Sequence, residues 1–169
     1  QGQPAVAGDA AGNFVVVWNS AGQAGGDHGA FAQRFDPAGL PLGGEFQVNS
    51  GVAGGATSPQ VAATATGDFV VAWQSYLPYP VLNEVRGQRL DPAGVPLGPE
   101  LQVNTYATGH QWHPEVGVDA AGDFVVVWDT SYEHIGLTVA GVRAQRFDST
   151  GVPAGAEFPV GGDHWDNFK

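Results

Sequence analysis

The stretch PEVGVDAAGDFVVVW, residues 114–128, decides the fold because the chain contains three versions of it. The same frame occurs as PAVAGDAAGNFVVVW at residues 4–18 and as PQVAATATGDFVVAW at residues 59–73. The spacing from proline to proline is 55 residues both times, from 4 to 59 and from 59 to 114. A period of this length is typical of supersecondary units that stack or surround an axis. The sequence therefore predicts a single repeat domain over residues 1–169, with units at residues 4–58, 59–113 and 114–169.

Each unit predicts four short strands. The opening run begins with proline, which the first position of a strand tolerates. A turn ending in glycine leads into FVVVW or FVVAW, which is apolar at every position and so typical of a strand buried on both faces. The third strand is expected at residues 30–36, 85–91 and 142–148, and the fourth at residues 45–48, 100–103 and 157–160. The predicted fold class is all-β, with three four-stranded antiparallel repeats.

The repeat also carries a resemblance to known proteins. The residues PxVAxDxxGxFVVVW followed by AQRFDxxGxPxGxEFQVN resemble tandem repeats of large bacterial secreted and surface proteins. The first half is similar to the blades of TolB-type β-propellers. This resemblance implies that each unit is a propeller blade, with its first strand along the axis and its fourth strand outermost. A three-fold closed form such as a β-prism or β-trefoil is the alternative, because three four-stranded units would also satisfy it.

Three blades do not complete a propeller, since closed propellers have about four to eight. Two ways of covering the end sheets are open. The chain is an arc of a longer propeller, or two chains pair around a two-fold axis to make a ring of six blades. The expected partner is therefore a second copy or further units of a longer chain. The absence of methionine at position 1 fits a chain that begins after processing or was cut from something longer.

Composition excludes several classes of function. Six Lys and Arg against 17 Asp and Glu give a net charge of −11, so a nucleic-acid groove and an anionic membrane surface are not expected as partners. Cysteine is absent, which removes disulfides and thiolate chemistry. No apolar run approaches the roughly 18 residues of a membrane span. An acidic, glycine-rich chain without cysteine predicts a secreted or cell-surface bacterial protein.

The repeated side chains are interpreted as scaffold. The tryptophans that end the frame, Trp18, Trp73 and Trp128, are expected to pack between units. The arginines of the QR[FL]D run are expected to be held by carboxylates across strands, since a partly buried guanidinium needs acceptors. These arginines are Arg34, Arg89 and Arg146, and the carboxylates in the same run are Asp36, Asp91 and Asp148.

The unrepeated side chains gather in the long connections, which the strand order places at one end of the sheets. These connections are residues 19–29, 49–58, 74–84, 104–113, 129–141 and 161–169. They hold all five histidines and all four tyrosines. The candidate ligand-binding set is Tyr76, Tyr79, Tyr106, Trp112, Tyr132, His134 and Trp165. Aromatic faces suit sugar rings and protein interfaces equally, and they also simply cover the ends of sheets.

A divalent metal is the one cofactor that the sequence suggests. His110 and His113 are three residues apart and could share zinc or nickel if their loop curls, although solvated histidines are the simpler interpretation. No nucleophile elbow, phosphate loop or HExxH motif occurs. The sequence therefore favours a non-enzymatic, lectin-like module that recognises a glycan or a protein. The alternatives are a structural brick of an extracellular assembly or filament, and a metal-dependent hydrolase.

Overall fold

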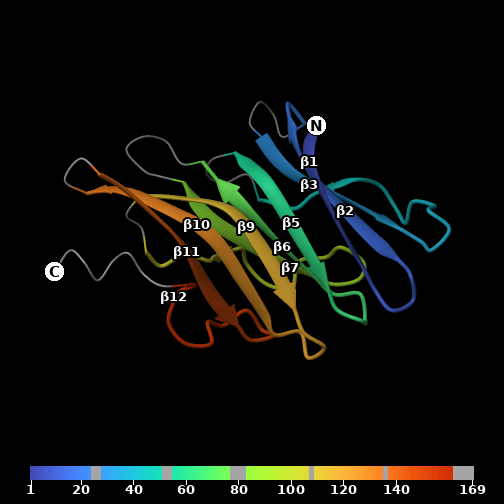
Figure 1. Cartoon of the computed structure of the whole chain (residues 1–169). Helices are drawn as coiled ribbons and strands as arrows, with labels where there is room; N and C mark the ends of the chain where they lie inside the picture. Colours follow the sequence, from blue (N-terminus) through green and yellow to red (C-terminus); the bar gives the residue numbers. More distant parts are fainter. Residues whose placement is uncertain (24–27, 51–54, 77–82, 107–108, 135–136, 162–169) are drawn as a thin grey trace.

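The computed structural model describes residues 1–23, 28–50, 55–76, 83–106, 109–134 and 137–161, without the side chains of residues 132–139 (Figure 1). These residues form three antiparallel sheets of four strands each. Sheet 1 contains β1 (Gly2–Gly8), β2 (Phe14–Ala21), β3 (His28–Phe35) and β4 (Phe46–Gln47). Sheet 2 contains β5 (Ala56–Ala63), β6 (Phe69–Ser75), β7 (Glu84–Leu90) and β8 (Leu101–Gln102). Sheet 3 contains β9 (His110–Val118), β10 (Phe124–His134), β11 (Leu137–Phe147) and β12 (Phe158–Pro159). The prediction of an all-β chain with three four-stranded repeats is confirmed.

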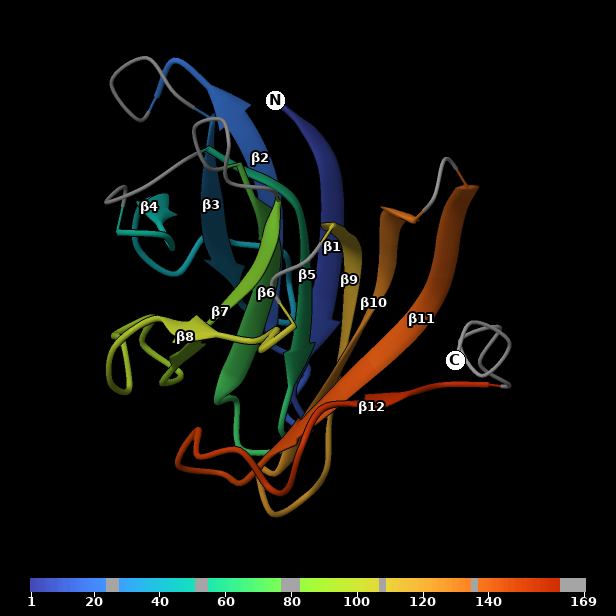
Figure 2. The same cartoon turned by 90° about the vertical axis from the view of Figure 1, so that its left-hand side faces the viewer.

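The strands follow chain order in every sheet, so each sheet is a meander from its first strand to its fourth. The first strands, β1, β5 and β9, lie side by side, and the sheets fan out from them (Figure 2). Among the described residues, sheet 2 packs closely against sheet 1 on one side and against sheet 3 on the other, and every close contact between strands of different sheets involves sheet 2. A three-fold closed form would also need sheets 1 and 3 to pack together. The three sheets instead form an open arc with two end faces.

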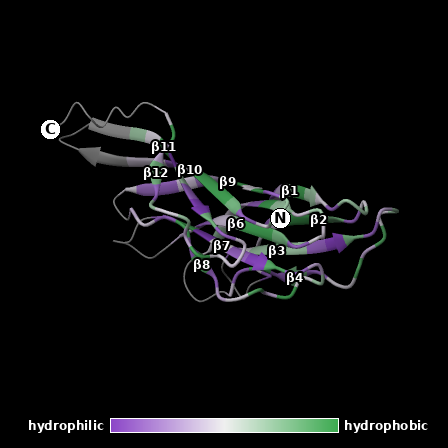
Figure 3. Ribbon diagram, turned by 90° about the horizontal axis from the view of Figure 1, so that it is seen from below, coloured by the Kyte–Doolittle hydropathy of each residue, from purple (hydrophilic) through white to green (hydrophobic). Residues whose placement is uncertain are grey.

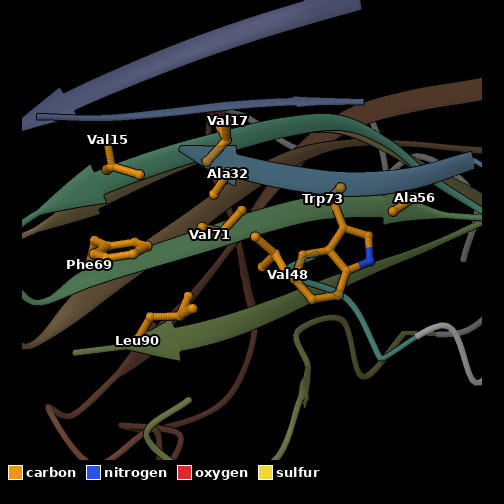
Figure 4. Close-up of a cluster of buried hydrophobic side chains, with 10 residues drawn as sticks. Val15, Val17, Ala32, Val48, Ala56, Phe69, Val71, Trp73 and Leu90 are labelled. Atoms are coloured by element: carbon orange, nitrogen blue, oxygen red, sulfur yellow. The ribbon is translucent and has the colours of Figure 1, made fainter. Parts of the chain in front are cut away.

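Two apolar cores hold the arc together. The first contains Val15 and Val17 of β2 packed against Phe69, Val71 and Trp73 of β6 (Figure 4). The second core lies between sheets 2 and 3 and is built around Val70, Ala72, Val126 and Trp128. The apolar middle strands of the meanders supply most of this surface, and Figure 3 shows β2 and β6 largely hydrophobic. The prediction that the repeated tryptophans pack between units is confirmed for Trp73 and Trp128, while Trp18 is only partly buried.

The three middle strands differ in how many faces they bury. Every residue of β6 is buried, because sheet 2 has a neighbour on both sides. Burial alternates along β2 and along the first seven residues of β10, because sheets 1 and 3 each have one neighbour. The prediction that all three middle strands are covered on both faces therefore holds for β6 alone.

In the described part of the chain, the arginines of the QR[FL]D runs pair with no carboxylate, contrary to the prediction. Arg34 donates to the carbonyl oxygens of Leu42 in its own turn and of Pro92 in sheet 2, at 2.9 and 2.6 Å. Arg89 repeats the pattern with Leu97 and with Thr150 of sheet 3, at 3.0 and 2.7 Å. Arg34 and Arg89 thus tie sheets 1 and 2 to the turn of the following sheet. The aspartates of the run accept backbone N–H groups within their own turns instead.

Parts of the segments predicted as loops are strands. Residues 110–113 belong to β9, and residues 129–134 and 137–141 extend the β10–β11 hairpin. The fourth strands are shorter than predicted, with two residues each. Pro159 lies in β12 at the edge of sheet 3, where the missing N–H costs no ladder bond, as predicted. No helix in the described part of the chain has the length and apolar character that crossing a membrane requires.

The turns give the fold an acid-sensitive element. The side-chain hydrogen bond from Asn13 lowers the pKa of Asp9, and the hydroxyl of Thr150 lowers the pKa of Asp148. A carboxyl whose pKa is lower in the folded chain stabilises the fold above its ordinary pKa of 3.8, and that contribution is lost as the pH falls through the folded pKa.

We therefore expect the urea midpoint to fall between about pH 5 and about pH 2.5. Thr150→Ala removes the largest cause of the low pKa of Asp148, so this variant should lose less stability over the same range. An equal loss in both proteins would contradict the role assigned to this hydrogen bond.

Candidate functional site

The candidate site lies at the end of the sheets where the first strands begin. Because each sheet is a meander, the connections that follow β2, β6 and β10 reach this end, and so do the connections between sheets. The segments meet there through backbone hydrogen bonds: the N–H of Tyr76 donates to the carbonyl of Gly55 at 3.0 Å, and the N–H of Gln111 donates to the carbonyl of Asn83 at 3.1 Å. The short turns lie at the opposite end.

An aromatic stack opens the first strand of sheet 3. The rings of His110 and Trp112 are 5.1 Å apart between centroids and nearly parallel, at 9°. The ring of His113 also stacks on Trp112, at 6.2 Å and 26°. Residues two apart in a strand point to the same face, which places His110 beside Trp112. His113 follows Trp112 directly, so its side chain can join the same stack only if the alternation of side chains between the two faces of the strand changes there.

A β-bulge supplies that change. His113 has a φ of 48°, a left-handed conformation that non-glycine residues adopt uncommonly. The register of β9 on β10 shifts at this point, between Val127 and Asp129. A bulge re-aims the side chain next to it. The same bulge occurs at Gln3 and Ser58, with φ values of 50° and 48°, so the distortion belongs to the scaffold of every unit.

Asp129 completes the group. Its Oδ2 lies 3.0 Å from Nδ1 of His113, and the two side chains are 50% and 70% exposed. An ion pair this exposed adds little to stability. Its exposure leaves the remaining carboxylate and imidazole atoms accessible to a ligand from solvent. We call Trp112, His113 and Asp129 the Trp112 group.

The Trp112 group differs from the other units at matched positions. The residue paired with Trp112 across the ladder is Asp129, and the same pairing joins Gly2 to Asn19 and Thr57 to Gln74. At the bulge, His113 stands where units 1 and 2 have Gln3 and Ser58. Units 1 and 2 thus carry small or neutral polar residues at places where unit 3 carries an indole, an imidazole and a carboxylate. The scaffold does not require the larger, chemically active set.

Of the other predicted site residues, the two whose side chains the structure describes, Tyr106 and Tyr76, do not join this group. Tyr106 lies under the guanidinium of Arg143, 5.1 Å from the ring centroid, and its N–H donates to Glu157 at 3.1 Å. Tyr76 is exposed just after β6. Tyr132 and His134 lie on β10, where they pair with Val139 and Leu137, but their side chains are outside the described residues. Tyr79 and Trp165 lie outside them altogether.

The metal prediction for His110 and His113 gains no third ligand. Within the described ranges, no three His, Asp or Glu side chains gather as a metal site would need. The two histidines are on a strand and not in the curling loop that the prediction required. His113 uses Nδ1 for Asp129.

Sequence reasoning missed a second set of repeated polar contacts. The glutamine of each QR[FL]D run is buried and donates to the carbonyl of the next residue in its strand and to the carbonyl of a glycine in the following turn; these residues are Gln33, Gln88 and Gln145. Their exact recurrence in the sequence was the available signal. Two hollows between the described residues lie at the short-turn end, between neighbouring sheets and away from the Trp112 group. At the candidate site, the exposed side chains of His113 and Asp129 face solvent.

Comparison with known proteins gives the fold. No family model matches the sequence, and no curated protein matches it. The endo-arabinase from Bacteroides thetaiotaomicron is 13% identical, with 96% of this chain and 63% of that chain covered and a TM-score of 0.60. A protein of unknown function from Dyadobacter fermentans is 12% identical, with 96% and 55% covered and a TM-score of 0.67. The chain spans less than two thirds of either structure, and at these identities the likeness concerns the fold.

Proposed function

We propose that the chain is a secreted or cell-surface module that binds a glycan without chemical turnover. Its three sheets would be blades of the β-propeller type, since first strands lying side by side and sheets fanning out from them suit a radial arrangement. The glycan would bind at the end of the sheets where the Trp112 group lies. The observation that carries the proposal is the divergence of unit 3 from units 1 and 2 at three matched positions.

The chemistry of the Trp112 group suits a sugar. An indole offers a flat apolar face to the C–H groups of a pyranose or furanose ring. A carboxylate accepts hydrogen bonds from hydroxyl groups, and an imidazole donates or accepts them. Asp129 and His113 are exposed next to Trp112, so their polar atoms would orient a sugar held against the stack of imidazole and indole rings. Binding sites held on a rigid sheet position such groups accurately.

The fold supports a carbohydrate ligand over a protein ligand. One protein that shares it is an enzyme named for acting on a carbohydrate, the endo-arabinase. The net charge of −11 also suits neutral polysaccharides better than acidic ones, which like charges would repel.

The test is binding of the intact chain and of Trp112→Ala to an array of neutral plant and bacterial polysaccharides that includes arabinan. We expect the wild type to bind at least one polysaccharide and Trp112→Ala to lose at least about tenfold in affinity, because truncating a tryptophan that anchors a ligand typically costs about 2 kcal/mol or more. Val95→Ala is the control, an exposed apolar residue at the short-turn end, and should bind as the wild type does.

Two outcomes would contradict the proposal. The wild type would bind none of the polysaccharides, or folded Trp112→Ala would bind as tightly as the wild type. Release of new reducing ends from a bound polysaccharide, abolished in Asp129→Asn, would show turnover and replace the binding module with an enzyme.

A further inference from the structure

Among the described residues, the arc ends in two faces that no further sheet covers, and these faces correspond to opposite sides of the same repeated interface. The head face is the side of sheet 1 turned away from sheet 2, and it carries Val6, Phe14, Val16 and Trp18. The tail face is the side of sheet 3 turned away from sheet 2, and it carries Val125, Val127, Val142, Phe158 and Val160. In sheet 2, the residues at the positions that match the head face point toward sheet 1. In sheet 1, the residues at the positions that match the tail face point toward sheet 2.

Exposure of apolar side chains is confined to the end units at these positions. Val142 is 40% exposed, whereas its counterparts Ala30 and Val85 are fully buried. Val160 is 48% exposed, against 6% and 1% for Val48 and Val103. The short-turn residues Leu40, Val95 and Val152 behave differently, since they are exposed in all three units. The tail residues are therefore interface residues that lack their next sheet.

The contacts at the outer strand repeat in the same sense. In sheet 2, Gly94 receives the ring of Phe46 from sheet 1, so closely that a Cβ at Gly94 would lie 2.8 Å from the ring. Gly151 of sheet 3 receives Leu101 of sheet 2 in the same way. Each of these contacts joins an apolar side chain of one sheet to a turn glycine of the next sheet. At the two ends of the arc, one such side chain and one such glycine remain. Phe158 is 39% exposed on the tail face, and the glycine at the matched turn of sheet 1, Gly39, would have nothing within 4 Å of its Cβ.

The polar contacts between sheets likewise leave a donor on the tail face and matching acceptors on the head face. Arg34 and Arg89 each reach a carbonyl in the turn of the following sheet, Pro92 and Thr150. Among the described residues, Arg146 donates only to Ala154 in its own turn. The matched carbonyls of the turn in sheet 1 are those of Pro37 and Ala38. An arginine at the tail thus corresponds to acceptors at the head.

We propose that the tail face of one copy of this chain binds the head face of a second copy, head to tail, in the geometry that already joins sheet 1 to sheet 2. In this arrangement Phe158 lies on Gly39 of the second copy and Arg146 reaches the turn at Pro37 of the second copy. Val125 and Val127 cover Trp18 of the second copy, as Val15 and Val17 share a core with Trp73. Burial of these apolar groups drives the association.

The second copy also borders the Trp112 group. Within one chain, the bulges of adjacent sheets meet where Gln3 donates to Ser58 Oγ at 3.0 Å and Ser58 N–H donates to Gln3 Oε1 at 2.8 Å. The same succession places Gln3 of the second copy beside His113. The association does not rest on the proposed glycan binding, because its apolar contacts on the tail face lie outside the Trp112 group.

The experiment is sedimentation velocity over a range of protein concentrations. One copy has a mass of 17.5 kDa, and we expect wild-type protein to reach about twice that mass or more. Val160→Asp blocks the tail face and Val6→Asp blocks the head face, so each should stay a single copy. Both side chains are largely exposed in one chain, which protects the fold. The matched control Val95→Asp adds the same charge at an equally exposed valine and should associate as the wild type does.

Mixing the two blocked variants distinguishes head-to-tail from same-face association. Val6→Asp keeps an intact tail and Val160→Asp keeps an intact head, so the mixture should form a species of two copies. Raising the salt concentration should favour association, because each copy carries a net charge of −11. Wild type that stays at 17.5 kDa, blocked variants that associate normally, or a mixture that stays as single copies would each overturn the proposal.

Discussion

Trp128→Ala should lower the free energy of unfolding by about 3–5 kcal/mol, because the small side chain leaves a cavity between sheets 2 and 3. Trp128 is buried in that core with Val70 and Ala72. The substitution also removes the hydrogen bond that its indole N–H donates to Gln111 Oε1 at 2.8 Å. The cavity weakens the contact between sheets 2 and 3, whereas the lost hydrogen bond lies within sheet 3, between β10 and β9.

The repeat provides a matched control at Trp18. This tryptophan occupies the same place in its strand but lies on the head face, where one copy of the chain leaves it partly exposed. Trp18→Ala should cost less than about 2 kcal/mol. Urea unfolding at protein concentrations where the chain is a single copy measures both values. Equal losses for the two variants would show that burial between sheets does not set the stability.

Gly94→Ala should lower the free energy of unfolding by about 2–4 kcal/mol, for two reasons that add. The backbone of Gly94 has a φ of +84°, which an L side chain adopts with strain. A Cβ at this position would also lie 2.8 Å from Cζ of Phe46, so the ring must move out of its place between sheets 1 and 2.

Gly39→Ala separates these two effects. Gly39 has nearly the same backbone, with a φ of +81°, but a Cβ there would meet no atom within 4 Å. The variant should therefore show the conformational cost alone, about 1–2 kcal/mol. If both variants lose the same stability in single-copy urea unfolding, the contact between Phe46 and Gly94 adds nothing, and the outer-strand part of the head-to-tail model loses its basis.

Particular residues show where the candidate site could be read from sequence and where it could not. His110, Trp112 and His113 stand out because they interrupt a repeat, which is visible without coordinates. The stacking of these rings depends on a bulge, and the contact of His113 with Asp129 depends on the pairing of two strands. Residues 113 and 129 are distant in the sequence, and no local pattern specifies that they meet. For the same reason Tyr106, which is close to Trp112 in sequence, contacts Arg143 instead.

The arginines illustrate a second limit. Sequence reasoning assigned carboxylate partners to Arg34 and Arg89, because opposite charges lie in the same run. The acceptors in the neighbouring sheets are backbone carbonyls, which lie in turns 58 residues after Arg34 and 61 residues after Arg89. Every residue has a carbonyl, so composition carries no signal for such a contact. The aspartates are occupied by the backbone N–H groups of their own tight turns, which a local pattern does predict.

The sequence by itself determined the number of units, the strands within each unit and the turns that join them. These follow from local patterns of apolar residues, prolines and glycines, which act over a few residues and recur every 55. Only the tertiary structure decided which copies of the repeated residues are buried. Burial depends on whether another sheet lies alongside, so equivalent strands are enclosed in the middle unit and half-covered at the two ends.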